Sequence, residues 1–526
     1  MRLLTFRVLT ATLCLLSYSI TFAQDLKLPS VFGSHMVMQR EMPVPVWGWA
    51  APDETVTVKF RDQSKTAKAD ADGKWMVKLD ALSLGEPATL TVSGNTDELT
   101  FEDVLVGEVW VCSGQSNMQW SVDRGLDPDL EAAAGHRPNI RLFRLPLVAA
   151  TEPQDDVDAE WTYCTPETLP AFTAVGYNFG RTLQEVLQVP VGLIQTAWGG
   201  TRAEAWTSPE MMASVEELKP IIDTWNERDG AYNAEAAQAK YDAELAEWEK
   251  ADAAAKAEGK TPPRKPSMEQ DPRQSQHHFS TLYNAMIAPL SPVAIRGAIW
   301  YQGESNASRA YQYRTLIASM IQSWRDDWKQ GDFPFYQVQL ANFRAITDEA
   351  VGSDWAELRE AQTIAAQALP NAGVACITDI GAALDIHPKN KQDVGKRLAR
   401  LALVDNYGYG DTITRSGPTY DSVEFKEGKA FVKFDTHGSS LETWYREPLT
   451  GFMIAGEDRN WVWADAQQVV NGDTVEVSSK YVSNPVAVRY NWADNPQGNL
   501  FNEKMLPAYP FRSDDWPGVT ANNVKP

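Results

Sequence analysis

The sequence contains little cysteine and little histidine: four and six residues, respectively, in a chain of 526. Cys14 lies in an N-terminal apolar run, which leaves Cys112, Cys164 and Cys376 at wide spacing. Three such cysteines permit at most one disulfide, so the composition excludes a disulfide framework. The sequence also lacks CxxC, HExxH and other close spacings of metal ligands. We therefore expect neither a metal ion nor a cofactor.

Long hydrophobic runs are absent after the N-terminus. Residues 1–23 combine Arg2 and Arg7 with an apolar run over 8–20 and a small residue, Ala23, at the end. This pattern is typical of a cleavable secretory signal. Because no later run approaches the length of a membrane span, we expect a soluble protein that is secreted or periplasmic.

Positive charge is scarce as well, since the formal net charge is −22. A chain with this charge is a poor candidate for binding nucleic acid. Aromatic residues are plentiful, with 19 Trp and 17 Tyr, which fits a carbohydrate-facing surface, although core packing explains most aromatics in any protein. The oligomeric state is left open.

The length predicts two or three domains. Residues 24–103 consist of short alternating segments separated by Pro, Asp and Gly, which indicates a small all-β domain. From 104 to 407 strands alternate with helical segments, which predicts a parallel sheet covered by helices. Residues 408–526 return to a strand pattern and are expected to form a second β-rich region.

An insertion rich in Ala, Glu and Lys is expected over residues 209–275. Tyr241, Leu245 and Trp248 recur on one helical face, and the Pro-rich segment 261–266 stops the helix. The insertion is either a helical flap beside the site or a solvated hairpin without a direct role.

The central feature of the α/β region is the stretch 105–120. An apolar, β-branched strand over 105–111 ends in a small polar turn that contains Ser116. In open α/β sheets, ligands bind beyond the carboxyl ends of strands, so Ser116 is a candidate nucleophile. The alternative is that this turn only caps the next helix.

Three further segments have the same strand-then-turn form: 189–200, 294–306 and 372–381, the last followed by an amphipathic helix over 392–404. Polar turns that follow buried strands meet at one edge of a parallel sheet. The sequence therefore predicts a single pocket at that edge.

The base that acyl transfer requires is sought among the six histidines. Five of them lie in the β regions or beside helices: His35, His136, His277, His278 and His437. His387 stands in a loop late in the α/β region, on the side where Ser116 is expected. Asp385, two residues earlier, is the candidate orienter of the imidazole, and Asp379 is the second choice. The alternative for Asp385 is a turn carboxylate.

Donors for a developing oxyanion are available in two of the turns. Gly199 and Gly200 can offer a backbone N–H where a side chain would obstruct the substrate. Gln302 and Asn306 carry side-chain amides that could serve the same oxyanion. Asn306 also begins a glycosylation sequon, a match that is accidental if Asn306 lines the pocket.

Four ordered motifs carry a family resemblance: GQSNM (114–118), WGGT (198–201), YQGESN (301–306) and DIHP (385–388). With these motifs the chain resembles the sialate O-acetylesterase family, a branch of the SGNH hydrolases. The resemblance spans nearly the whole chain after the signal and includes SVFGSHMVMQR (30–40), EAW (204–206), LYNAMIAPL (282–290), FYQVQLANF (335–343) and RYNWADNPQGNLFN (489–502).

The resemblance implies an α/β fold: a flavodoxin-like, three-layer SGNH hydrolase domain with N-terminal and C-terminal β-sandwich-type regions. It also implies a metal-free serine esterase in which Ser116 is the nucleophile, His387 is the base and Gly199 or Gly200 is an oxyanion donor. The third motif departs from the superfamily pattern, so either Gln302 or Asn306 supplies the amide. The last motif departs as well, so either Asp385 or a backbone carbonyl orients His387.

The expected reaction is removal of O-acetyl groups from sugars, and the expected partner is an O-acetylated carbohydrate. A sialate substrate would need a nearby cation, for which Arg202 is the candidate, and Glu204 and Glu304 are further candidates for substrate binding. Acetylated plant or algal polysaccharides, such as xylan or pectin, are the alternative substrates. A carbohydrate-binding protein with a vestigial site and a lipid esterase or thioesterase are the competing functions.

Overall fold

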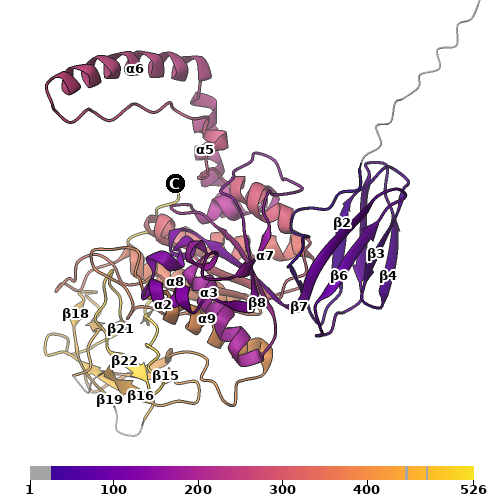
Figure 1. Ribbon diagram of the computed structural model, residues 1–526. Coiled ribbons are helices and arrows are strands. Elements are labelled where there is room, and N and C mark those ends of the chain that lie inside the picture. Colours follow the sequence, from indigo (N-terminus) through magenta and orange to yellow (C-terminus); the bar gives the residue numbers. More distant parts are fainter. Residues whose placement is uncertain (1–24, 445–447, 469–471) are drawn as a thin grey trace, which may run out of the picture.

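The computed structural model describes residues 25–444, 448–468 and 472–526 (Figure 1). The expected signal segment, residues 1–23, lies outside the described residues. The chain forms a mixed α/β structure around a central mixed sheet. The N-terminal and C-terminal β regions lie on different sides of this central part (Figure 1). No described helix has both the length and the apolar character that a membrane crossing requires.

The N-terminal region consists of short strands whose side chains alternate between buried and exposed, as in Thr55–Phe60. These strands are β1 (Val37–Gln39), β2 (Val44–Trp49), β3 (Thr55–Phe60), β4 (Gln63–Lys68), β5 (Lys74–Leu79) and β6 (Ala88–Ser93). β2 pairs with β5, and β3 pairs with β4 and β6, all antiparallel. Period-2 alternation in the sequence therefore corresponds to real strands here.

One long strand, β7 (Glu98–Gly114), belongs to both the N-terminal region and the central sheet. Its first part pairs with β6 and β1, and its second part, from Glu108 onward, pairs with β10. The expected boundary between residues 103 and 104 falls inside this strand. The two regions are thus joined by continuous hydrogen-bonded backbone and not by a linker.

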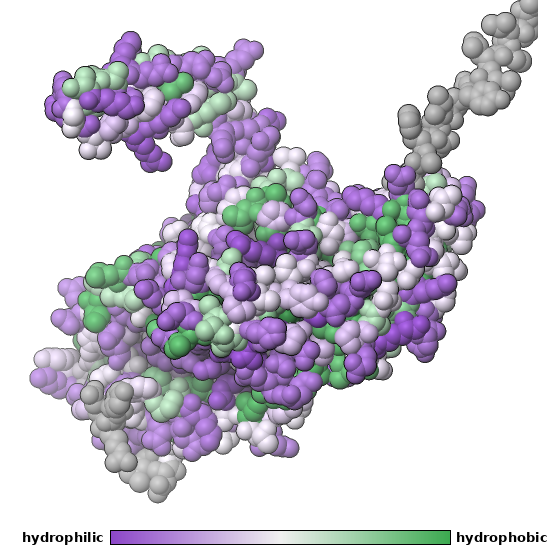
Figure 2. Space-filling model, viewed as in Figure 1, coloured by the Kyte–Doolittle hydropathy of each residue, from purple (hydrophilic) through white to green (hydrophobic). Residues whose placement is uncertain are grey.

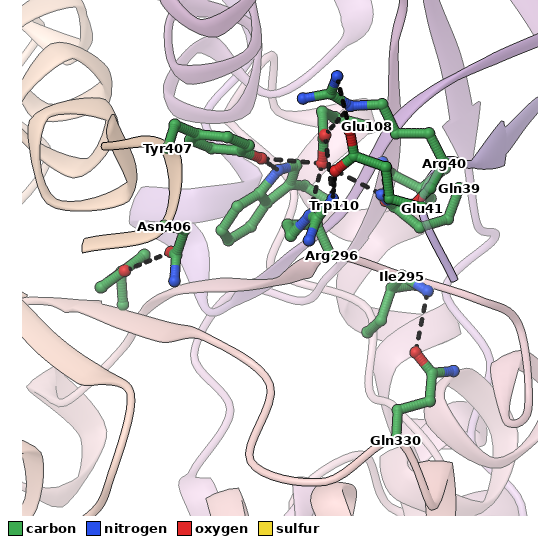
Figure 3. A network of polar contacts seen from close by, with 12 residues as sticks. Gln39, Arg40, Glu41, Glu108, Trp110, Ile295, Arg296, Gln330, Asn406 and Tyr407 are labelled. Atoms are coloured by element: carbon green, nitrogen blue, oxygen red, sulfur yellow. Dashed lines mark hydrogen bonds and ion pairs between the residues drawn. The ribbon is translucent and has the colours of Figure 1, made fainter. Parts of the chain in front are cut away.

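A buried carboxylate lies in the middle of β7. Glu108 is inaccessible to solvent and accepts hydrogen bonds from Arg40 Nε (2.5 Å), Arg296 Nε (2.8 Å), Tyr407 Oη (2.8 Å) and Gln39 Nε2 (3.2 Å) (Figure 3). The partners come from three distant segments of the chain. Since a buried carboxylate needs such partners, this network fixes the N-terminal region against the entry to β11 and the end of α9.

The central sheet has the strand order β13-β12-β11-β7-β10-β8-β9, and all pairs are parallel except β8 with β9. Besides β7, these strands are β8 (Arg137–Arg144), β9 (Trp161–Cys164), β10 (Val191–Ala197), β11 (Gly297–Tyr301), β12 (Phe335–Val338) and β13 (Ala372–Ala375). The strand-then-turn segments predicted from the sequence correspond to β7, β10, β11 and β13. β10 pairs with one side of β7 and β11, the next strand in the chain, pairs with the other side, so the strand order reverses at β7.

Helices cover both faces of this sheet. Ile299 and Tyr301 point into a core shared with α3 (Ala174–Leu187) and α9 (Lys391–Tyr407). Ala298 and Trp300 point into the opposite core, which contains α7 (Ala310–Trp328) and α8 (Asp354–Ala368). The near-continuous apolar runs of the sequence follow from this burial on both faces. The short helices α1 (Ser116–Gln119) and α2 (Pro128–Ala133) lie near the sheet edge.

The insertion expected at 209–275 is helical. Its first part is buried in the core through Met212, Ile221 and Trp225, and the remainder projects from the body as an arm (Figure 1). It contains α4 (Pro209–Ser214), α5 (Lys219–Ala231) and α6 (Ala234–Ala257), and α6 ends before the Pro-rich segment expected to stop it. In α6 only Ala237 is buried, and the arm is mostly hydrophilic (Figure 2). Trp248 packs within the arm, where its Nε1 donates to the Pro263 carbonyl.

The C-terminal region is rich in antiparallel strands, as its sequence pattern predicts. They are β14 (Thr419–Lys426), β15 (Lys429–Asp435), β16 (Leu441–Thr443), β17 (Phe452–Ala455), β18 (Val462–Trp463), β19 (Asp465–Gln468), β20 (Thr474–Ser478), β21 (Ala487–Tyr490), β22 (Leu500–Asn502) and β23 (Phe511–Arg512). The cysteines of the described chain, Cys112, Cys164 and Cys376, are buried and unpaired.

Candidate active site

Ser116 stands at the carboxyl end of β7, the strand at which the sheet order reverses. Gly114 makes the turn possible: its φ is +139°, and a Cβ there would lie 2.2 Å from the Tyr301 carbonyl oxygen. The next residue, Gln115, donates its N–H to that same oxygen (3.0 Å). The chain therefore leaves the sheet sharply, and Ser116 begins α1 at the switch point where open α/β sheets bind ligands.

The structure brings His387 to Ser116 although 271 positions separate them. His387 Nε2 lies 2.8 Å from Ser116 Oγ. His387 comes from the loop between β13 and α9, and its side chain is 26% exposed. This distance fits the contact between a hydroxyl nucleophile and an imidazole base that serine acyl transfer requires.

Asp385 lies beside His387 but contacts it loosely. Asp385 Oδ1 is 3.5 Å from His387 Nδ1, beyond a good hydrogen bond, and it accepts the backbone N–H of His387 at 2.9 Å. The carboxylate is half-exposed. It thus stabilises the turn, which was the structural alternative, while remaining close enough to influence the imidazole. Asp379 is held by Arg397 in a bidentate ion pair (2.6 and 2.7 Å).

Trp120 packs against the face of the His387 imidazole. The two rings are stacked, with centroids 4.6 Å apart and an interplanar angle of 12°. Burial lowers the pKa of His387 below its usual value, and the nearby charge of Lys391 lowers it further, against the opposing effect of Asp385. A neutral imidazole, the form that can accept a proton from Ser116, is therefore favoured.

The glycine turn after β10 lies directly against Ser116. A Cβ on Gly199 would be 3.3 Å from Ser116 Cβ, so a larger residue would crowd the hydroxyl. The Gly199 N–H is already used, since it donates to Gln119 Oε1 (2.8 Å). Gly200 has a φ of +77°, and its N–H has no hydrogen-bond partner among the described residues. Of the two glycines, Gly200 has the available donor.

The amides of the third motif support this turn from behind. Gln302 Nε2 donates to the Thr201 carbonyl (3.3 Å) and to Asn306 Oδ1 (2.6 Å). Asn306 Oδ1 also accepts from the Ala203 N–H (3.0 Å). Both side chains are almost fully buried. Both hydrogens of the Gln302 amide are therefore used, whereas Asn306 Nδ2 donates one hydrogen to Glu204 (2.9 Å) and has no second acceptor among the described residues. The burial of Asn306 makes its sequon inaccessible for glycosylation.

The predicted substrate-binding residues differ in their surroundings. Glu204 is fully buried and accepts from Asn306 Nδ2 (2.9 Å) and Arg309 Nη2 (2.5 Å). The Glu304 carboxylate is also turned inward, where it accepts from Asn117 Nδ2 (2.5 Å). Arg202, in contrast, is partly buried, and within the described residues its guanidinium has no ion-pair partner. Only Arg202 is therefore available to a ligand.

Sequence reasoning missed four residues of this site. Asn117, Gln119 and Trp120 stand in the motif that contains Ser116, and their spacing of one to four residues could have indicated a shared turn. Lys391 had no signal, because an isolated lysine at a helix start is ordinarily a surface residue. Within the described part of the chain, no cluster of His, Cys, Asp and Glu side chains has a metal-site arrangement.

Comparisons with known proteins agree with this geometry. The family described as "Carbohydrate esterase, sialic acid-specific acetylesterase" matches residues 106–236 and 267–403. The gap between these two ranges covers most of α6 and its return segment. The matched residues include all four motifs.

Several relatives are similar along nearly their whole length. A solved structure described as a novel carbohydrate acetylesterase from Xanthomonas citri is 37% identical, covers 94% of this chain and all of its own, and has a TM-score of 0.78. The sialate O-acetylesterase of Mus musculus is 28% identical over 92% of this chain and 94% of its own. The Homo sapiens sialate O-acetylesterase is 28% identical over 95% of each chain. The chain therefore belongs to the sialic acid-specific acetylesterase family of carbohydrate esterases and is an ester hydrolase.

Proposed function

We propose that the protein is a serine esterase that removes O-acetyl groups from sugars through an acetyl-enzyme intermediate. The observation that carries the proposal is the 2.8 Å contact between Ser116 Oγ and His387 Nε2 at the switch point of the sheet. Family membership supports the carbohydrate ester, and the relatives named above are acetylesterases. The signal pattern of residues 1–23 supports secretion or a periplasmic location.

The proposed reaction begins when His387 Nε2 takes the proton of Ser116 and the serine oxygen attacks the acetyl carbonyl. The tetrahedral intermediate collapses when His387 returns that proton to the sugar oxygen, which leaves as the alcohol. Water, deprotonated by the same imidazole, then cleaves the acetyl-enzyme and releases acetate. Trp120 and Asp385 restrict the ring so that Nε2 faces the serine throughout.

The oxyanion is bound by the backbone N–H groups of Ser116 and Gly200. Ser116 opens α1, and the first N–H groups of a helix have no intrahelical partner. Gly200 supplies the second donor from the adjacent turn. Gln302 and Asn306 contribute by holding the segment after Gly200, and Glu204 contributes by anchoring Asn306.

The central domain is proposed to be a flavodoxin-like SGNH hydrolase domain. When the edge strands β8 and β9 are set aside, the order β10-β7-β11-β12-β13 is 2-1-3-4-5 in chain order, which is the flavodoxin arrangement. The helical layers on both faces give the three-layer form.

The substrate is proposed to be an O-acetylated sialate, since Arg202 offers a partly buried cation beside the glycine turn. Acetylated xylan or pectin is the second candidate, since the Xanthomonas citri relative is described as a carbohydrate acetylesterase and no particular sugar is named. Acetate release from O-acetylated sialoglycans and from acetylated xylan, measured side by side, distinguishes the two.

Substitution Ser116→Ala tests the mechanism. We expect it to abolish release of p-nitrophenol from p-nitrophenyl acetate and labelling by a fluorophosphonate, with an unchanged melting temperature. Turnover retained by the variant contradicts the proposal. Absence of labelling in the unmodified protein would instead indicate a carbohydrate-binding protein with a vestigial site, and efficient hydrolysis of octanoyl esters would indicate a lipid esterase.

A further inference from the structure

A buried polar cluster lies directly behind the proposed nucleophile and base. It consists of Asn117, Lys391 and Glu304. Asn117 and Lys391 are 1% and 0% exposed, and Glu304 Oε2 is shielded from solvent and has no hydrogen-bond partner among the described residues. Buried charges are costly unless they are paired and hydrogen-bonded. The proposed reaction as described above uses none of the three.

Lys391 is an unusual residue for its position. It is the first residue of α9, where the helix dipole is positive, and burial removes the water that an ammonium binds strongly. Burial lowers its pKa to about 7, against the opposing charges of Glu304 and Asp385. Its Nζ donates to Asn117 Oδ1 (2.5 Å) and lies 5.2 Å from the centre of the Tyr301 ring.

The contacts of Asn117 allow only one orientation of its amide. Oδ1 faces the Lys391 Nζ, while Nδ2 donates to Glu304 Oε1 (2.5 Å) and to the Ile386 carbonyl (3.0 Å). A carboxylate and a carbonyl only accept, whereas an ammonium only donates, so a flipped amide would lose every contact. The donor that reaches Ile386, the residue before His387, is therefore held in place by Lys391.

We propose that Lys391 is a positioning residue for hydrolysis: through Asn117 it fixes the backbone at Ile386 and so holds the His387 imidazole against Ser116. The role rests on the proposed serine esterase mechanism. Lys391 thereby orients the imidazole, which Asp385 does only weakly because its carboxylate is 3.5 Å from His387 Nδ1. Glu304 completes the unit by accepting the other Asn117 hydrogen. Burial raises the pKa of its carboxyl group, and the Asn117 hydrogen bond and the charge of Lys391 oppose that rise.

The ammonium also acts on His387 through its charge. The charges that act on the imidazole are Lys391 on α9 and Asp385 on its own loop. Glu304 contacts Asn117, and Arg124 lies 5.8 Å from the centre of the Trp120 ring. Lys391 lowers the pKa of His387, second only to burial. Removing the positive charge of Lys391 should therefore raise the pKa of His387. The imidazole would then be neutral over a narrower pH range.

Two substitutions separate positioning from charge. In Lys391→Gln the amide can still donate to Asn117 but carries no charge, whereas Lys391→Met loses both. With p-nitrophenyl acetate we expect kcat to fall about 10²-fold in Lys391→Met, the scale of a small misplacement of a catalytic group, and far less in Lys391→Gln. In both variants the acid limb of kcat/KM should move to higher pH. Lys389→Met, which removes an exposed lysine two residues away, is the matched control and should match the unmodified protein.

A double variant guards against instability, since Lys391→Met leaves Glu304 without a counter-charge. Lys391→Met with Glu304→Gln removes both charged groups, and it should show the same loss of kcat as Lys391→Met and an upward shift of the acid limb that is no larger than in Lys391→Met. NMR titration of His387, with and without Lys391→Met in a Ser116→Ala background, should show a higher His387 pKa when Lys391 is replaced. An unchanged acid limb and equal kcat losses in the Gln and Met variants overturn the inference. The proposed function fails separately, if Ser116→Ala retains turnover.

Discussion

Arg202 is the residue on which the proposed sialate substrate depends most directly. It follows the Gly199–Gly200 turn by two residues, it is partly buried, and no carboxylate pairs with it within the described chain. The imidazole of His277 lies close to Gly200, since its Cε1 would be 3.9 Å from a Cβ there. A partly desolvated guanidinium without a protein partner is well suited to bind a carboxylate from a ligand.

We expect Arg202→Gln to lower kcat/KM for an O-acetylated sialate by about 10- to 100-fold, the value of a charge-assisted hydrogen bond of about 1.5–3 kcal/mol. Because p-nitrophenyl acetate has no carboxylate, its hydrolysis should change little. Steady-state kinetics with both esters measure the difference. Arg264→Gln, on the exposed return segment of the arm, is the control. An equal fall in kcat/KM for both esters would show that Arg202 does not bind the carboxylate of the substrate.

At the level of elements, the site depends on how the turn after β11 supports the turn after β10. Ser305 Oγ donates to the Gly200 carbonyl (2.9 Å), and Gln115 Oε1 accepts from the Gly303 and Ser305 N–H groups (3.3 and 3.4 Å). With the Gln302 and Asn306 contacts, these bonds connect the three turns that follow β7, β10 and β11. Three separate loops therefore form one rigid unit at the edge of the sheet.

Asn306→Ala should weaken this unit. It leaves the Ala203 N–H without an acceptor, at a cost of about 1–3 kcal/mol for a buried unsatisfied group. It also removes one of the two acceptors of the Gln302 amide and the Asn306 donor to Glu204, which keeps its bond from Arg309. We expect a lower free energy of unfolding in urea, together with a fall in kcat of up to about 10²-fold as Gly200 shifts. Ser308→Ala, the exposed serine of the same sequon, should leave both quantities unchanged. An unaltered kcat in Asn306→Ala would show that the oxyanion donors do not depend on this support.

At the scale of the whole molecule, β7 connects the N-terminal β region to the central sheet. Its N-terminal part is built into the small β region, its middle holds the Glu108 network, and its carboxyl end presents Ser116. Burial alone would raise the pKa of Glu108, but the hydrogen bonds and charges of Arg296 and Arg40 hold it below its usual value. The ionised carboxylate thus stabilises the assembled molecule, at the opposite end of the central sheet from the candidate active site.

Glu108→Gln should destabilise the protein by about 3–5 kcal/mol, because two partly buried arginines lose their shared charge partner. The pKa of Glu108 is lowered on folding, so its contribution is present above the ordinary value of 4.5 and is lost as pH falls below it. The difference in unfolding free energy between unmodified protein and variant should therefore shrink under acid conditions.

Glu41→Gln provides the control, since Glu41 pairs with the same two arginines but is 59% exposed. Its loss should cost no more than about 1 kcal/mol. At neutral pH, folded Glu108→Gln should keep the kcat of the unmodified protein, because Ser116 lies at the far end of β7. A lower kcat in folded Glu108→Gln than in the unmodified protein would contradict this separation.

Much of this organisation could be predicted from the sequence because it depends on local patterns. Alternating side chains indicated β2, β3, β5 and β6, and buried apolar runs indicated β7, β10, β11 and β13. Small polar turns after those runs identified Ser116 and the two glycines, since the carboxyl ends of parallel strands share one edge. The scarcity of histidine then indicated His387.

Only the tertiary structure decided which hydrogen-bond partner each polar group at the sheet edge has. The sequence by itself determined which residue types stand at the sheet edge, because strand periodicity and turn composition are local properties. It could not show that Gly199 is already bonded, that Asn306 faces inward, or that a lysine at the start of α9 reaches the residue beside Ser116. Those facts depend on side-chain directions in elements that are up to 274 residues apart, and directions at that separation are set by packing alone.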